Sequence, residues 1–170
     1  MSDINRHVPF FEDLQVGDVH RSRIGRTISE TDNTWFTLLT GNTNQVHFNE
    51  EFAKGTRFGQ ILVNSCLTLS IVVGLSVADT SENAVANLSW ESISLPSPVF
   101  VGDTLWSESE VLERRESRSR PTVGIVGVRT RGINQRGEVV CEYRRSFMVP
   151  KRDAPEARDA FPVPEAPWST

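Results

Sequence analysis

Hydrophobic and polar positions divide this chain into a helical first half and a strand-rich second half. The longest apolar run, residues 61–77, contains no charged side chain and is interrupted only by small or neutral residues. A helix that is apolar on every side is expected to be buried on every side. At helical rise this run spans roughly 25 Å, close to the width of a small domain. The pattern therefore predicts one long central helix.

Four segments after this run are rich in Val, Ile, Thr and aromatic residues, as strands are. Gly- or Pro-containing turn signals separate them, so long strands are joined by short connections and should pair antiparallel. Helices followed by strands indicate an α+β domain. The predicted fold is an antiparallel sheet wrapped around a long central helix, the hot-dog architecture. The predicted strands are residues 84–95, 104–113, 122–133 and 138–149.

Weaker signals precede the central helix. Residues 20–28 can form a first strand, although they are rich in arginine. Residues 29–32, Ser-Glu-Thr-Asp, have the spacing of a capping box that opens a helix. That helix carries apolar residues at 35, 36, 38 and 39, and Gly41 is a natural stop just past it. Residues 49–58 predict a second, short helix and a loop.

Composition narrows the class of protein. The 170 residues suit one domain, predicted as residues 1–150, with a proline-rich tail at 151–170. A net charge of −4 and a pI near 5.4 argue against a nucleic-acid partner. No apolar run suits a transmembrane helix and residues 1–9 lack a secretory h-region, so a soluble cytoplasmic protein is expected. Cys66 and Cys141 are predicted to be buried, reduced thiols.

A polar loop, residues 41–47, lies between hydrophobic flanks and contains Asn42, Asn44 and His47. Polar groups in such surroundings cost free energy to desolvate unless they are paired. A histidine there can simply hold a loop in the core by hydrogen bonds. The order and spacing of Gly41, Asn44 and His47 between the apolar flanks favour a catalytic interpretation. Histidine suits acid/base catalysis because its pKa lies near neutrality.

The same loop, Gly-Asn-Thr-Asn-Gln-Val-His, resembles the hydratase signature of MaoC-like dehydratases and R-specific enoyl-CoA hydratases, Gly-Asp-x-Asn-Pro-x-His. Residues 58–65 are similar to the family segment that enters the central helix, and residues 95–105 to the segment before its third strand. The resemblance runs in the same order over about residues 10–149. It implies the hot-dog fold and action on an acyl-CoA thioester.

In that family, the Asp and His of the signature activate water for syn addition across the double bond of a trans-2-enoyl-CoA. A backbone N–H near the start of the central helix binds the thioester oxygen. The resemblance implies that His47 is the acid/base residue, that Asn42 stands in the place of the aspartate, and that Ser65 supplies the N–H. Gln45 replaces the signature proline. The residues assigned to substrate binding are Asn44, Asn64, Lys54 and Arg57, of which Lys54 and Arg57, close to the signature, are alternative contacts for the CoA phosphates.

Asn42 leaves three outcomes open, because an amide cannot accept a proton as a carboxylate does. His47 can be the sole acid/base, with Asn42 orienting the water. A carboxylate can come from elsewhere in the chain. The domain can also bind acyl-CoA without turnover. The nearest candidate carboxylates in sequence are Asp32, Glu50, Glu51 and Asp79.

The predicted function is reversible hydration of a 2-enoyl-CoA or dehydration of a 3-hydroxyacyl-CoA. The alternatives are a hot-dog acyl-CoA thioesterase and a non-catalytic acyl-CoA-binding subunit. CoA enters as part of the substrate, and no separate cofactor or metal is expected. An exposed sheet edge predicts a homodimer or higher homo-oligomer, without nucleic-acid or membrane partners.

Three other features can be explained either by a purely structural role or by a function in the site. Ser65 can be an ordinary first-turn helix residue. The arginines at a predicted hairpin tip can meet CoA phosphates, although charge runs usually form a solvated surface. Phe161 and Trp168 can dock the tail on the body or on a partner, or the tail can be loosely held. The tip arginines are Arg114, Arg115, Arg118 and Arg120.

Overall fold

The computed structural model describes residues 8–155, 157 and 165. Its helical elements come first along the chain, apart from two short strands, and its long strands follow, as an α+β domain requires. The helical elements are η1 (Phe11–Asp13), α1 (Glu30–Leu39), η2 (Gln45–His47), α2 (Glu50–Lys54) and α3 (Ser65–Thr80). The strands are β1 (Val19–Arg21), β2 (Arg26–Thr27), β3 (Ala86–Ser94), β4 (Thr104–Glu116), β5 (Val123–Asn134) and β6 (Val139–Pro150).

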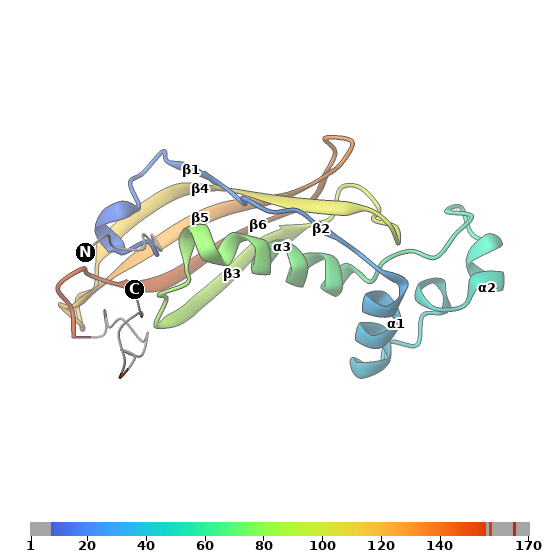
Figure 1. Ribbon diagram of the computed structural model, residues 1–170, viewed down its shortest axis with the longest axis horizontal. Coiled ribbons are helices and arrows are strands. Elements are labelled where there is room, and N and C mark those ends of the chain that lie inside the picture. Colours follow the sequence, from blue (N-terminus) through green and yellow to red (C-terminus); the bar gives the residue numbers. More distant parts are fainter. Residues whose placement is uncertain (1–7, 156, 158–164, 166–170) are drawn as a thin grey trace.

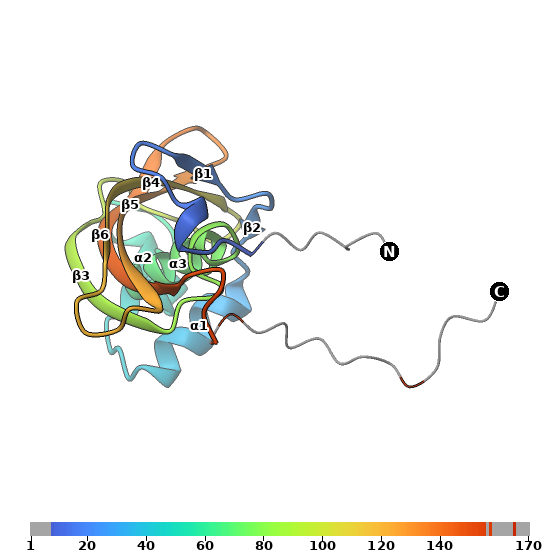
Figure 2. The same ribbon diagram turned by 90° about the vertical axis from the view of Figure 1, so that its left-hand side faces the viewer.

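The strands form a single antiparallel sheet in the order β1-β4-β5-β6-β3, with β2 also paired to β4. The sheet curls around α3, which lies along its concave side (Figure 1) and is seen nearly end-on inside the curve in Figure 2. The predicted hot-dog architecture is confirmed. All four long strands were predicted at nearly their observed bounds.

The central helix begins later than predicted, at Ser65, and continues to Thr80. Residues 61–63 are extended instead, because Leu62 forms a β-bridge with Phe100 and the Val63 N–H donates to the Val99 carbonyl at 2.9 Å. The prediction of burial on every side was also wrong. One face of α3 is exposed along the small residues Cys66, Ser70, Gly74 and Ala78, because the sheet covers only the other side.

On its covered side, α3 packs unusually close to β5. A Cβ atom at Gly132 would lie 2.3 Å from a methyl carbon of Val72, so glycine is needed at this crossing. Val72 itself is fully buried, and around it lies the main apolar cluster between the helix and the sheet. This contact fixes α3 along the sheet, and with it the position of the helix start.

The predicted first strand is split into β1 and β2. Between them the chain crosses the indole of Trp106, and a Cβ atom at Gly25 would lie 2.3 Å from that ring. The backbone therefore leaves the ladder here and rejoins β4 at Arg26, which is opposite Leu105. The extended character of residues 20–28 was predicted correctly, and its interruption was not.

Helix α1 opens with the predicted capping box, in which Ser29 and Asp32 bond each other's backbone N–H groups. Gly41 follows it with φ +63°, in the left-handed region suited to a helix stop. Its buried side chains are polar, Asn33 and Thr37. Its large apolar side chains face outward instead, with Trp35, Leu38 and Leu39 exposed by 65, 66 and 79%.

The cysteines and the predicted tail were also the subject of predictions. Both cysteines are free thiols, and only Cys141 is buried, because Cys66 lies on the exposed first turn of α3. The beginning of the predicted tail contacts the body, where Arg152 pairs with Asp13 and the Lys151 N–H donates to Thr122. Phe161 and Trp168 lie outside the described residues.

No helix in the described part of the chain is long and apolar enough to cross a membrane.

Candidate functional site

Helices α1 and α2 project beyond the end of the sheet at which α3 begins (Figure 1). The polar loop 41–47 follows α1 at this end and closes with η2. The topology therefore brings His47 near the start of α3. His47 is 6% exposed, and its Nδ1 lies 2.9 Å from the carbonyl oxygen of Leu62. A carbonyl only accepts, so in neutral imidazole Nδ1 carries the hydrogen and Nε2 keeps a lone pair.

The Nε2 atom of His47 is accessible. Among the described residues, the side-chain nitrogen and oxygen atoms that are both sealed from solvent and unpartnered are His20 Nε2 and Arg145 Nε. His47 is 6% exposed, and its Nε2 atom, which has no hydrogen-bond partner in that part of the chain, is not one of these sealed atoms. A neutral imidazole with a solvent-reachable Nε2 is suited to act as a general base.

Asn33 is the residue at this site that the sequence analysis missed. It is 1% exposed, and its amide bonds the backbone at three points, the carbonyls of His47 and Leu62 and the N–H of Asn64. Asn33 and Thr37 are four residues apart on α1, a spacing that normally marks a solvent-facing polar stripe. No signal in the sequence distinguishes that stripe from a polar face turned inward.

The two loop asparagines hold the backbone of the signature. Asn42 Oδ1 accepts the N–H of Asn44 at 2.9 Å, and Asn44 Oδ1 accepts the N–H of Val46 at 3.3 Å. Asn42 is half-buried and Asn44 is exposed. These contacts give both residues a local structural role, and they leave the Nδ2 group of Asn42 as its available donor.

Ser65 is the first residue of α3 and Asn64 is its N-cap. The side chain of Asn64 accepts the Cys66 N–H at 3.0 Å, so one first-turn donor is satisfied. The Ser65 N–H has no acceptor among the described residues, as expected for the first N–H groups of a helix. The positive end of the helix dipole lies here as well. A preformed donor for an oxyanion is therefore available at Ser65.

A cavity of about 220 Å³ lies beside this helix start. Its lining brings together Ser65, Arg57 and the segment before β4. Lys54, the other predicted phosphate contact, is paired with Glu50 and Glu51 on α2 and is not in the lining. The lining residues are Arg57, Phe58, Leu62, Val63, Ser65, Thr68, Leu95, Pro96, Ser97, Pro98 and Val99.

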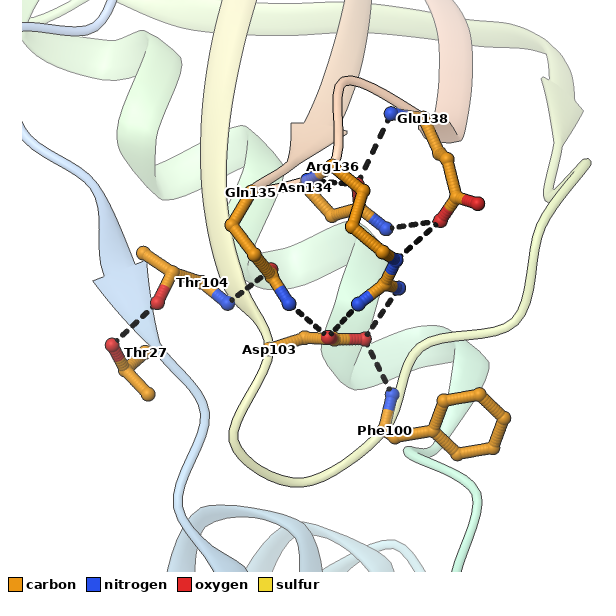
Figure 3. Close-up of polar contacts among 8 residues, drawn as sticks. All are labelled: Thr27, Phe100, Asp103, Thr104, Asn134, Gln135, Arg136 and Glu138. Atoms are coloured by element: carbon orange, nitrogen blue, oxygen red, sulfur yellow. Dashed lines mark hydrogen bonds and ion pairs between the residues drawn. The ribbon is translucent and has the colours of Figure 1, made fainter.

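The outer wall of this cavity is anchored by Asp103, which is buried. Its carboxylate accepts hydrogen bonds from Gln135 at 2.6 Å, from Arg136 at 2.8 Å and from the Phe100 N–H at 3.0 Å (Figure 3). Burial acts to raise the pKa of Asp103, but the bonds from Arg136, Phe100 and Gln135 outweigh it and lower the pKa. The β5–β6 hairpin thus holds the segment that lines the cavity.

The candidate carboxylates are engaged elsewhere. Asp32 completes the capping box, and the Ser29 N–H, more than its bond to Arg26, lowers its pKa. Glu50 and Glu51 face Lys54 on the surface of α2. Asp79 lies near the other end of α3, about 20 Å from Ser65 at helical rise. In the described part of the chain, none of these four is hydrogen-bonded to His47.

The hairpin arginines lie far from this cavity. Arg114 and Arg115 directly precede Glu116, the last residue of β4, and this end of β4 lies at the opposite end of the sheet from the start of α3 (Figure 1). Arg114 bonds Gln15 and lies over the ring of Phe11. The structure therefore does not bring this cluster together with His47 and Ser65.

A second hollow, about 300 Å³, is lined by residues of strands β3, β4, β5 and β6. Glu91, Glu113 and Arg144 supply its charged groups, and no helix start opens into it. Its lining therefore lacks the unpaired backbone donor that acyl chemistry needs. His47 lines neither hollow, but it bonds the carbonyl of Leu62, which lines the cavity at Ser65. The cavity at Ser65 is the better candidate active site.

The chain matches the family described as MaoC like domain over residues 13–132. It is 38% identical over 156 residues to the mesaconyl-CoA hydratase of Cereibacter sphaeroides, covering 92% of this chain and 45% of that protein. It is 30% identical to the (R)-specific enoyl-CoA hydratase of Rhodospirillum rubrum, covering 84% of this chain and 93% of that protein. The chain thus spans under half of the first relative and nearly all of the second.

A solved structure is also similar to this chain. The crystal structure of a MaoC-like dehydratase from Rhodospirillum rubrum superimposes with a TM-score of 0.73 at 30% identity. The match covers 85% of this chain and 98% of that one. The likeness therefore extends over most of this chain.

Proposed function

Because this chain belongs to the MaoC-like dehydratase family, we propose that it catalyses reversible hydration of a 2-enoyl-CoA, or equally dehydration of a 3-hydroxyacyl-CoA. One observation carries this proposal. His47 donates through Nδ1 to the carbonyl of Leu62, which lines the cavity together with Ser65, and this bond leaves the lone pair of Nε2 free. A base close to an oxyanion donor supplies the two parts that this addition requires.

In the proposed reaction, the thioester carbonyl lies against the Ser65 N–H. His47 Nε2 takes a proton from water as the oxygen of that water forms a bond to C3. The π electrons move toward C2 and the thioester oxygen, and the Ser65 N–H and the α3 dipole stabilise that enolate charge. The protonated Nε2 then delivers its hydrogen to C2. Histidine alone thus performs both proton transfers, since Asn42 cannot ionise.

The substrate is an acyl-CoA thioester, and Arg57 is the cavity residue placed to meet a phosphate of CoA. A relative at 38% identity is named for mesaconyl-CoA, so a branched dicarboxylic enoyl-CoA belongs among the substrates tested. We also propose that the protein works as a homodimer or higher homo-oligomer, since β3 is an edge strand and one face of α3 is uncovered.

The test follows the absorbance of the enoyl thioester after protein is added to crotonyl-CoA and mesaconyl-CoA. We expect turnover, and we expect His47→Ala to reduce kcat by at least about 100-fold, the usual contribution of a general acid/base. His20→Ala is the matched control, because His20 is a partly buried histidine on β1, away from the cavity, and it should keep near-normal activity. Full activity in His47→Ala would remove His47 from the mechanism.

A second candidate is an acyl-CoA-binding subunit without turnover. The observation that favours it is Asn42, whose amide oxygen is committed to the Asn44 N–H and which cannot serve as a base. Tight acyl-CoA binding with no loss of enoyl absorbance would support this candidate. Release of free thiol from a saturated acyl-CoA would point to a thioesterase instead.

A further inference from the structure

The amide of Asn33 lies between the two halves of the candidate site. Its Nδ2 donates to the His47 carbonyl at 2.8 Å and to the Leu62 carbonyl at 3.3 Å. Its Oδ1 accepts the Asn64 N–H at 2.8 Å. Asn33 comes from α1, whereas its partners come from η2 and from the segment that enters α3. One buried side chain therefore joins three separate segments.

Each of these bonds affects a group with a proposed role. The Leu62 carbonyl receives both the Asn33 amide and the Nδ1–H of His47, one donor for each of its two lone pairs. The bond to the His47 carbonyl fixes the backbone that carries the imidazole. The Asn64 N–H directly precedes Ser65, so the bond to Oδ1 fixes the start of α3.

We propose that Asn33 is a positioning residue that holds His47 in its Nδ1–H form and sets the imidazole against the Ser65 N–H. Its effect on turnover rests on the proposed function, whereas its effect on the tautomer does not. The tautomer of a histidine is set by the partner of its other nitrogen. The Leu62 carbonyl selects the Nδ1–H form, and Asn33 keeps that carbonyl in place.

The direct test is nuclear magnetic resonance of protein labelled with ¹⁵N-histidine, in which three histidines contribute signals. His47 is assigned by its loss in His47→Ala. We expect the neutral wild-type imidazole to be mainly the Nδ1–H tautomer. Asn33→Ala should shift the population toward Nε2–H. A wild-type protein found mainly in the Nε2–H form would overturn the proposal before any variant is made.

Turnover gives the second readout. Misplacing a base or an oxyanion donor acts in the transition state, so kcat and kcat/KM should fall together by roughly 10- to 100-fold, with little change in KM. Asn33→Asp provides a second variant of the same shape. It keeps the acceptor for the Asn64 N–H and loses the donor for Leu62, so it should shift the tautomer as well.

Thr80→Val is the control for a purely structural effect. Thr80 is fully buried and bonds the Ser76 carbonyl at the opposite end of α3. It should lower the melting temperature without moving the His47 tautomer or kcat. An unchanged tautomer in both Asn33 variants, or an equal shift in Thr80→Val, would contradict the proposal. A tautomer shift in a protein that turns over no enoyl-CoA would leave the positioning role intact and reject the hydratase function.

Discussion

At the scale of single residues, the site depends on which backbone groups are left unpaired. Asn64 Oδ1 satisfies the Cys66 N–H, and Asn64's own N–H is taken by Asn33. The Ser65 N–H between them has no acceptor in the described part of the chain. The N–H proposed to hold the thioester oxygen is thus the one left free between two neighbouring N–H groups that are paired.

This N–H can be removed with little other change. Proline suits the first position of a helix, where it lacks only an N–H that is unpaired anyway. It also requires an extended residue before it, and Asn64 already has ψ 129°. Ser65→Pro should therefore fold and lose roughly 100- to 1,000-fold in kcat, as when one oxyanion donor is removed. Steady-state kinetics with crotonyl-CoA measure this.

Ser65→Ala keeps the N–H and removes only the hydroxyl, so it should retain activity within a few-fold. Equal losses in Ser65→Ala and Ser65→Pro would assign the effect to the hydroxyl rather than to the backbone.

At the scale of elements, the cavity wall is held by an ion pair between two connections. Asp103 belongs to the turn before β4, and Arg136 to the β5–β6 hairpin (Figure 3). Through Asp103 the pair also fixes the Phe100 N–H, and Phe100 forms the bridge with Leu62. The extended segment at Leu62, which receives the His47 hydrogen bond, is therefore supported from the hairpin.

Removing Arg136 should destabilise the fold in a pH-dependent way. Arg136→Ala leaves a buried carboxylate without its charged partner and should lower the unfolding free energy near neutral pH by more than the loss of an exposed ion pair does. The pKa of Asp103 is lowered in the folded state. The stabilisation is therefore fully present above the unfolded value of about 4 and is lost as pH falls through the lower folded value. Urea unfolding from pH 7 to pH 3 measures the difference.

Arg129→Ala is the matched control, because Arg129 pairs with Glu110 at an exposed position on the sheet. Its cost should stay below about 1 kcal/mol. A difference between wild type and Arg136→Ala that grows as the pH falls would contradict the assigned direction.

At the scale of the whole molecule, several apolar surfaces are left uncovered. Edge strand β3 exposes Leu88, Trp90 and Ile93 by between 38 and 47%. The small-residue face of α3 and the outer side of α1 are also exposed. An unpaired edge with apolar side chains is a template for another strand, so we expect a second copy of the chain to cover it.

A charge on this edge should disrupt the assembly. The wild type should elute with about twice the 19.1 kDa chain mass or a higher multiple, and Ile93→Lys should shift it toward the monomer. Light scattering after size-exclusion chromatography measures the mass. Ile24→Lys is the control, since Ile24 is 65% exposed between β1 and β2, on the opposite edge. A monomeric wild type would reject this interface.

The sequence by itself determined the elements that depend on local pattern. Periodicity predicted the four long strands, the capping box at Ser29 and the stop at Gly41, because propensity and capping act between neighbours in the chain. The resemblance to the family signature likewise pointed to His47 as the candidate acid/base residue. The start of α3 was misplaced, since residues 61–63 gain their hydrogen bonds from Val99 and Phe100, which are distant in sequence.

Only the tertiary structure decided which polar groups at the site are paired. It turned Asn33 inward, assigned the Asn42 amide to its own loop, and brought Asp103 together with Arg136 across 33 residues. Hydrogen bonds between segments far apart in the chain produce no periodic pattern of residues in the sequence. The candidate base was therefore readable in the sequence, whereas the contacts proposed to fix its tautomer and its position follow from how the segments meet.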